Sequence, residues 1–234
     1  MKLVLPLFVL LLSAAACTPA TLQYPSRSVS RETFFSQVRT LAYAPVLSSD
    51  SPGSHEFANK VGSFTAAVLA KRGLRLMSDA AWQTCWKSGV ASMGGLYSAD
   101  SGRLDEAKET KLRWQCHQQV VSELNVDAVL ETEVLLVHAP MESDVVRWHG
   151  VEEDVASFGE RFWSGTYSGT LPALSLHVRI TDRRGKVLYD SAGGIEVAAT
   201  RDGNNLVDKP ALLKDNAKLR EAVRVALARL FAEE

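Results

Sequence analysis

The stretch VDAVLETEVLLV, residues 126–137, decides how the rest of the chain is interpreted. Valine and leucine dominate it, and such apolar runs are typical of a β-strand inside a sheet. Two of its three carboxylates, Glu131 and Glu133, are two positions apart, so they share one face of the strand at a separation of about 7 Å. We predict a strand here, and its neighbours indicate which kind of sheet it joins.

The residues upstream predict a strand, a helix and a second strand. Residues 38–47 are apolar enough for a strand inside a sheet. A helix begins at Ser51 or Ser54 and ends at Gly73, with one apolar face formed by Phe57, Val61, Phe64 and Val68. A short strand follows at residues 74–77. This order implies a right-handed parallel crossover.

Two helices are expected between this unit and the strand at 126–137. Ser78 and Asp79 cap the first, which ends before a Gly/Ser-rich loop at 89–102 and carries Trp82, Cys85 and Trp86. The second begins at Asp105, and its apolar stripe consists of Leu112, Cys116, Val120 and Leu124.

Downstream, we expect an irregular insertion over residues 139–172. An alternating strand at 174–181 and a turn at 182–185 then lead into a returning strand with a bend at Gly193-Gly194. Asp208 and Pro210 open a closing amphipathic helix. The pattern predicts a single α/β domain over residues 32–234, with a mixed β-sheet flanked by helices.

The N-terminus has the pattern of an export signal. Lys2 precedes an apolar run that is too short to cross a bilayer, and small residues lead up to Cys17. We interpret residues 1–16 as a signal peptide and residues 17–31, which are polar and contain Pro and Ser, as a flexible tether.

The cleavage motif leaves two alternatives open. Leu12-Ser-Ala-Ala-Ala-Cys17 resembles the bacterial lipobox, whose Cys receives acyl chains such as palmitate, although Ala14 stands where that motif usually has Leu. Ala14-Ala-Ala16 also fits the A-x-A rule for a soluble periplasmic or secreted protein. Lipidation of Cys17 is favoured because it leaves an even pair of cysteines. Thr18, rather than Asp, follows the Cys, which favours the outer membrane.

The order of elements resembles a known group of envelope proteins. The features are a helix ending in KRG at 71–73, the DAVLETEV strand at 127–134, the DRRGKVLY hairpin at 182–189 and the amphipathic C-terminal helix. Together with the tether, they resemble the curli-secretion channel lipoprotein, the penicillin-binding-protein activator lipoproteins and the N-terminal domain of the Tol translocation propeller protein. The resemblance implies a non-enzymatic envelope protein that binds other proteins.

Composition and motifs disfavour several classes of function. With 26 basic and 27 acidic residues, and without dense basic runs, the chain offers no footprint for nucleic acid. The sequence shows no Gly-rich phosphate loop, no nucleophile elbow and no histidine pair at zinc-ligand spacing. We therefore expect no cofactor and no metal.

Glu131 and Glu133 are the candidates for acid/base chemistry. If the strand at 174–181 pairs antiparallel, His177 and Arg179 oppose them. One interpretation is an acid/base cluster, which implies an enzyme of unrecognised type. The favoured one is cross-strand charge pairing, worth about 0.2–1 kcal/mol per pair.

Cys85 and Cys116 lie on the apolar stripes of two predicted helices. Buried free thiols are common, but an oxidising periplasm favours a disulfide between them.

Aromatic residues in the 139–172 insertion are candidates for protein binding: Trp148, Phe158, Phe162, Trp163 and Tyr167. The alternative is a loop that packs its own aromatic side chains. The sequence thus predicts a membrane-anchored lipoprotein that binds or assists other envelope proteins without catalysis. Self-assembly into a homo-oligomer is the alternative.

Overall fold

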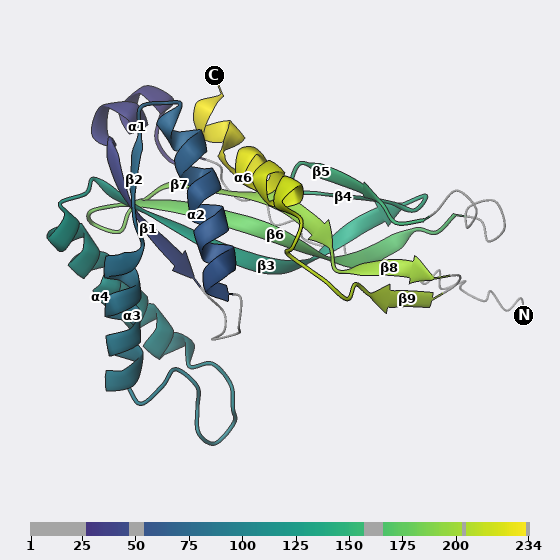
Figure 1. Ribbon diagram of the computed structural model, residues 1–234, viewed down its shortest axis with the longest axis horizontal. Coiled ribbons are helices and arrows are strands. Elements are labelled where there is room, and N and C mark those ends of the chain that lie inside the picture. The colour runs from purple at the N-terminus through teal and green to yellow at the C-terminus, as the bar shows by residue number, and fades with distance from the viewer. Residues whose placement is uncertain (1–26, 47–53, 157–165, 203–204, 233–234) are drawn as a thin grey trace, which may run out of the picture.

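The computed structural model describes residues 27–46, 54–156, 166–202 and 205–232. Within them the chain forms a single α/β domain with a curled, mixed seven-stranded sheet flanked by helices (Figure 1). The fold class predicted from the sequence is therefore confirmed. The signal peptide at 1–16 and Cys17 lie outside the described residues.

Five of the seven strands lie side by side in the spatial order β2 (Arg75–Met77), β1 (Thr40–Val46), β3 (Ala128–Glu142), β6 (Gly169–Asp182) and β7 (Val187–Val197). β1 is parallel to both β2 and β3, so the predicted parallel crossover is present. β6 is antiparallel to both of its neighbours, β3 and β7. The longest pairing joins β3 to β6, from Ala128 opposite Asp182 to Met141 opposite Gly169.

Helices cover both faces of this sheet. One face packs against α1 (Arg31–Gln37), α2 (Ser54–Ala70) and α6 (Asn216–Phe231), and the other against α3 (Ala80–Ser92) and α4 (Glu106–Leu124). Alternation along β1 supplies both contacts: Leu41 and Tyr43 join the first core, whereas Ala42 and Ala44 join the second. α3 continues three residues beyond Gly89, where a loop was expected.

The contact between α6 and β7 depends on Gly193. A Cβ atom there would lie 2.1 Å from the carbonyl oxygen of Ala222, so only glycine lets the helix backbone approach this closely. The Tyr189 hydroxyl donates to the Ala226 carbonyl nearby. β7 continues as one strand through both glycines, but its register against β6 shifts by one residue between Gly194 and Glu196. Such an irregularity bends a strand locally, at the place where the sequence predicts a bend.

The expected irregular insertion at 139–172 is wrong, because most of its described residues lie in strands. β3 extends to Glu142, and β4 (Val145–Trp148) and β5 (Val151–Asp154) precede β6. A two-residue turn joins β3 to β4, with φ of 52° at Ser143 and 64° at Asp144. A second one joins β4 to β5, with φ of 39° at His149 and 79° at Gly150. Positive φ at both central residues is the geometry of a tight hairpin turn.

The β4–β5 hairpin is tied to the rest of the domain by Glu153. Its carboxylate accepts from Lys209 Nζ at 2.6 Å and lies 3.1 Å from Lys218 Nζ, and it also accepts the Val197 N–H at 3.2 Å. These contacts join β5 to β7, to the segment after β9 and to the start of α6.

The closing helix begins later than predicted. Asp208 belongs to a small hairpin of β8 (Ala199–Asp202) and β9 (Asn205–Asp208). α6 begins at Asn216, where the Asp215 carboxylate accepts the N–H groups of Ala217 and Lys218. The true N-cap is therefore Asp215 rather than Asp208.

The domain also begins earlier than predicted. Arg27 forms a β-bridge with Tyr189, the Ser28 N–H donates to the Leu188 carbonyl at 3.1 Å, and Ser30 caps α1. Residues 27–31, assigned to the tether from the sequence, thus lie on the domain.

Among the described residues, no helix is long and apolar enough to cross a membrane.

We predict that Gly193→Ala lowers the free energy of unfolding by about 1–3 kcal/mol, because the added methyl group forces α6 away from β7. Gly169→Ala is the matched control, since a Cβ atom on this strand glycine meets nothing within 4 Å. It should change stability by less than about 0.5 kcal/mol. Urea unfolding of both variants measures the difference, and equal effects would contradict the packing argument.

Candidate functional site

Six polar side chains lie on the sheet face that α3 and α4 partly cover. We call them the polar strip: Glu131 and Glu133 on β3, Ser175, His177 and Arg179 on β6, and Asp190 on β7. Alternation along each strand places them on one face, because the pairings Glu131–Arg179, Glu133–His177 and Arg179–Asp190 are directly opposite. The antiparallel register that the sequence analysis considered is confirmed.

The ion pairs of the polar strip also involve a helix and a third strand. Arg113 of α4 lies 3.2 Å from Glu131 and 4.0 Å from Glu133, and it binds Glu109 at 2.6 Å. On the other side of β6, Asp190 receives His177 Nε2 at 2.7 Å and Arg179 Nε at 3.0 Å. Charged groups therefore join α4 to β3 on one side, and β6 to β7 on the other.

The Asp190 carboxylate is held in its charged form. Burial alone would raise the pKa of Asp190, but the hydrogen bond and charge of His177 and those of Arg179 outweigh it and lower the pKa below its ordinary value of 3.8. Only 7% of Asp190 is exposed, as is 6% of His177. A buried carboxylate that is hydrogen-bonded to a histidine and a guanidinium on the adjacent strand suits a structural role.

A histidine that the sequence analysis did not single out closes one end of the strip. His149, in the β4–β5 turn, is hydrogen-bonded through Nδ1 to Ser175 Oγ at 2.7 Å, and its carbonyl accepts the Gly194 N–H at 3.0 Å. Burial and the charge of His177 lower the pKa of His149. The His149-Gly150 pair between the valine-containing segments 145–148 and 151–155 was the available sign of a hairpin turn.

The side chains of the polar strip are engaged within the protein. Ser175 is fully buried, Arg113 binds the two glutamates, and Asp190 binds His177 and Arg179. In the described parts of the chain, no three His, Cys, Asp or Glu side chains come together as metal ligands. His117 is 3% exposed and stacks on Trp114 of the same helix, so it is packed inside the protein rather than presented to solvent.

A separate hollow of about 300 Å³ lies between α2 and the end of β2. Tyr43 forms one wall, but its hydroxyl donates to the Ala58 carbonyl at 3.1 Å and lies 3.0 Å from Thr132 Oγ1. Burial raises the pKa of Tyr43 well above its ordinary value. The hydroxyl is thus engaged within the protein.

The candidate protein-binding residues fall in different environments. Trp148 is 7% exposed, packs against Gly194 and donates from Nε1 to the Leu174 carbonyl at 3.1 Å, so it belongs to a core and offers no contact surface. Tyr167 is 38% exposed. Phe158, Phe162 and Trp163 lie outside the described residues.

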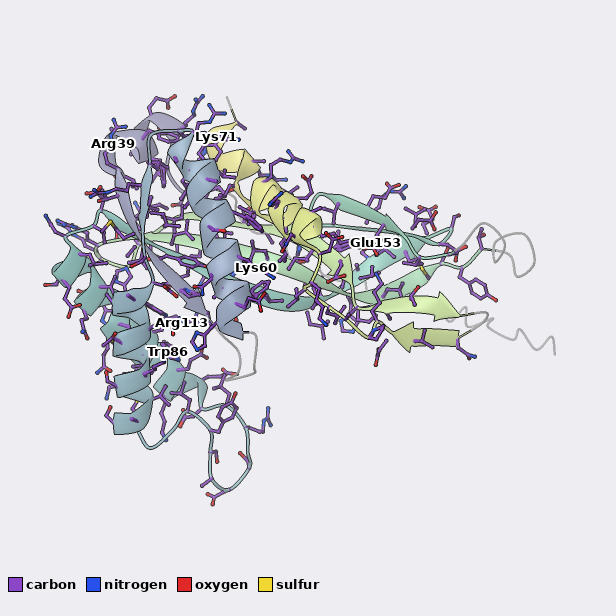
Figure 2. The ribbon with its side chains drawn as sticks, viewed as in Figure 1. Arg39, Lys60, Lys71, Trp86, Arg113 and Glu153 are labelled. Atoms are coloured by element: carbon purple, nitrogen blue, oxygen red, sulfur yellow. A yellow bond between two sulfur atoms is a disulfide. The ribbon has the colours of Figure 1, made fainter. Side chains whose placement is uncertain are left out.

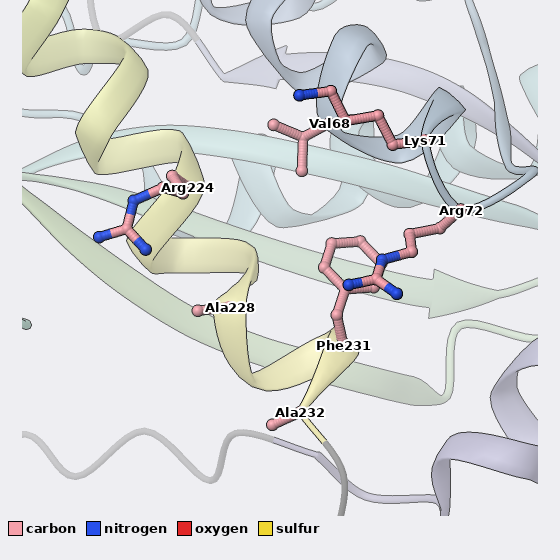
Figure 3. Close-up of a pocket in the computed structure, with 7 residues that line it drawn as sticks. All are labelled: Val68, Lys71, Arg72, Arg224, Ala228, Phe231 and Ala232. Atoms are coloured by element: carbon pink, nitrogen blue, oxygen red, sulfur yellow. The ribbon is translucent and has the colours of Figure 1, made fainter.

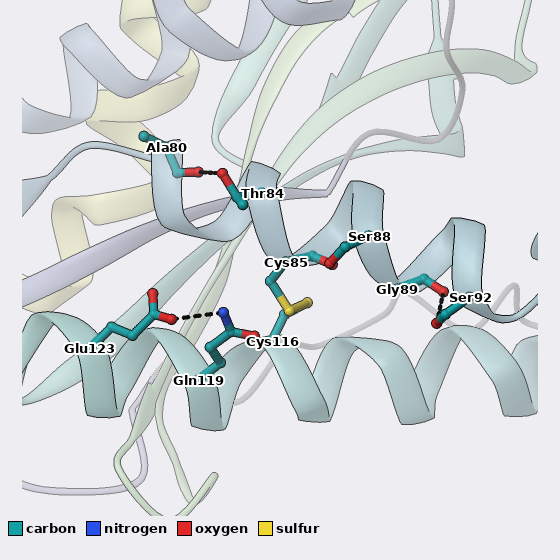
Figure 4. The surroundings of a disulfide bond; sticks show 9 residues. All are labelled: Ala80, Thr84, Cys85, Ser88, Gly89, Ser92, Cys116, Gln119 and Glu123. Atoms are coloured by element: carbon teal, nitrogen blue, oxygen red, sulfur yellow. Dashed lines mark hydrogen bonds between the residues drawn. A yellow bond between two sulfur atoms is a disulfide. The ribbon is translucent and has the colours of Figure 1, made fainter.

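Cys85 and Cys116 are joined by a disulfide, with S–S at 2.09 Å and Cα–Cα at 5.5 Å (Figure 4). The bridge links α3 to α4 in a core that also contains Trp82, Leu112 and Val120.

We predict that Asp190→Asn lowers the free energy of unfolding by about 1–3 kcal/mol at pH 7, because His177 and Arg179 lose a charged acceptor. The pKa of Asp190 is lower in the folded protein than its ordinary value of 3.8, so the ionised carboxylate stabilises the fold fully above pH 3.8. This stabilisation is lost as the pH falls through the pKa that Asp190 has in the folded protein. The difference between wild type and variant should therefore narrow below pH 3.8.

The control is Glu221→Gln, which removes a carboxylate whose pairing with Arg224 is solvent-exposed. It should cost less than about 0.5 kcal/mol. Urea unfolding from pH 7 down to pH 3 measures both variants. If the stability of Asp190→Asn fell between pH 3.8 and pH 3 as steeply as that of the wild type, the stabilising role of the ionised Asp190 would be refuted.

No protein-family model and no curated protein sequence matches the chain. Among solved structures, it is similar to the PelC dodecamer from Paraburkholderia phytofirmans, with 9% identity, a TM-score of 0.38, and coverage of 91% of this chain and 97% of that one. It is also similar to lipoprotein GNA1162 from Neisseria meningitidis, with 17% identity, a TM-score of 0.34, and coverage of 75% and 90%. At TM-scores this low, neither similarity assigns a function to the chain.

Proposed function

We propose that this chain is a lipid-anchored protein of the bacterial envelope. It presents its α/β domain to other envelope proteins and does not catalyse a reaction.

The observation that carries the proposal is the disulfide between Cys85 and Cys116. Disulfides persist in oxidising compartments, so the bridge supports export from the cytoplasm. It also uses two of the three cysteines in the chain. The cysteine that is left, Cys17, follows directly after the small residues Ala14-Ala-Ala16, where a lipoprotein carries its acyl group.

The polar strip supports a binding protein over an enzyme. The alternative assigns acid/base roles to Glu131, Glu133 and His177. In the structure, Arg113 holds both glutamates and Asp190 holds the histidine. A general acid or base must reach the proton that it transfers. Groups occupied in this way are suited to holding α4 against β3 and β7 against β6.

The surface proposed for protein contacts is the far end of the β3–β6 pairing, together with β4, β5, β8 and β9. We call this the distal arm, and Figure 1 shows it extending away from α3 and α4. It carries three exposed apolar side chains: Leu136 at 63%, Val207 at 39% and Tyr167 at 38%. Tyrosine is enriched among the residues that contribute most to binding at interfaces, whereas leucine and valine are not, so Tyr167 is the expected anchor of this surface.

We predict that Cys17→Ser abolishes labelling by a palmitate analogue and moves the protein from the membrane to the soluble fraction. The double variant Cys85→Ala/Cys116→Ala is the control. It should keep the label but lose about 3–4 kcal/mol of stability, because the loop of 31 residues is no longer closed. Absence of label in the wild type would mean that cleavage after Ala16 yields a soluble protein.

We further predict that Tyr167→Ala reduces the recovery of an envelope partner after cross-linking in living cells and capture of the protein. Trp114→Ala is matched to it, since Trp114 is 47% exposed but lies on α4, away from the distal arm. Loss with Trp114→Ala alone would move the contact to α4. Recovery of the protein only with its own copies would favour the self-assembly alternative.

A further inference from the structure

Basic side chains from separate segments of the chain gather at one end of the domain, where β1 and β2 begin and α2 and α6 end. We call this the basic end: Arg39, Lys71, Arg72, Arg75, Arg224 and Arg229. The Arg75 N–H donates to the Arg39 carbonyl at 2.9 Å, which joins the starts of the two strands. Figure 2 shows Arg39 and Lys71 at this same end.

A groove of about 340 Å³ lies in the basic end, between the last turns of α2 and α6. Its polar lining is cationic, with Lys71, Arg72 and Arg224, and its apolar lining consists of Val68, Ala228, Phe231 and Ala232 (Figure 3). Arg72 lies over the Phe231 ring, 5.2 Å from its centroid, and this places the guanidinium beside the groove. Such a lining suits an anionic group attached to an apolar one.

Most of the positive charge here is unneutralised. All six basic residues are exposed, and in the described chain Arg39, Lys71, Arg75 and Arg229 form no ion pair. The nearby carboxylates are already engaged: Glu221 binds Arg224, and Asp127 accepts the N–H groups of Arg39 and Thr40. An excess of exposed cations of this kind attracts an anionic surface.

The tether joins the domain beside this groove. Arg27 pairs with Tyr189, whose hydroxyl contacts Ala226 of α6, and Phe35 of α1 packs against Phe231 with ring centroids 6.2 Å apart. From Cys17 to Arg27 the chain can span at most about 35 Å. The proposed anchor therefore keeps the basic end close to the bilayer, and this orientation rests on the proposed function.

We propose that the basic end binds the phosphate headgroups of anionic phospholipids, with the groove accepting one headgroup. Lys71 and Arg72 contact the phosphate, with Arg224 and its partner Glu221 beside them, while Phe231 and Val68 pack against the first methylene groups of the acyl chains. Each basic residue close to an anionic membrane strengthens binding about fivefold. A single lipid anchor gains most from a second signal of this type.

The test uses the full chain carrying Cys17→Ser, so that no acyl group contributes. Cosedimentation is measured with vesicles of phosphatidylglycerol and phosphatidylethanolamine, and with vesicles of phosphatidylcholine. We expect binding to the anionic vesicles only, weakened by salt. Lys71→Glu/Arg72→Glu should reduce it at least about tenfold. The control Lys87→Glu/Lys111→Glu makes the same change of charge at exposed positions on α3 and α4 and should stay within about twofold.

Equal loss in the two double variants would overturn the site, because net charge alone would then explain the binding. Equal binding to both kinds of vesicle would overturn the requirement for anionic lipid. Stabilisation by inorganic phosphate without binding to vesicles would identify a free anion as the ligand and overturn the lipid. Circular dichroism verifies that each variant is folded. Because Cys17 is absent throughout, failure here is distinguishable from failure of the lipid anchor.

Discussion

The pairing of β3 with β6 is the interaction on which the rest of the structure depends. Its near end lies within the sheet, where β3 also pairs with β1, and so it joins the parallel part of the fold to the antiparallel part. Its far end carries the distal arm, since β4 pairs with β3 beyond Met141. A ladder this long specifies its register strongly, because a slip of one residue would move the apolar residues Leu174 and Leu176 to the polar face.

The polar strip adds a constraint on the neighbouring register, that of β6 against β7. A shift of β6 against β7 would separate Asp190 from His177 and Arg179 and leave a buried carboxylate without its partners. Such a loss is costly in a poorly solvated site, whereas correct pairing adds little net stability. The buried charges thus favour one alignment of β6 and β7 over the shifted ones. His149 extends this network to the β4–β5 hairpin through Ser175.

The basic end is a charged surface that the overall composition of the chain does not predict. The chain is nearly neutral, and no basic run stands out in it. The fold nevertheless brings the start of β1, the end of α2, the start of β2 and the last turns of α6 to one end, and each contributes one or two cations. Their carboxylate neighbours are occupied by Arg224 or by backbone N–H groups. The result is a local excess of positive charge beside the point where the tether enters.

The sequence by itself determined the order of the main elements and the parallel crossover, because hydrophobic periodicity and glycine positions are local properties of the chain. It placed His177 and Arg179 opposite the two glutamates only on the condition that the two strands pair antiparallel. It did not reveal that Trp148 is buried, that the His149-Gly150 turn folds a hairpin onto β7, or that α6 begins only at Asn216. Nor did it reveal which partners Glu131 and His177 take. Only the tertiary structure decided these features, since each depends on contacts between distant residues, on the close approach of α6 at Gly193 and on the way that the hairpin covers Gly194. No local pattern encodes the distance between two surfaces that meet only after folding.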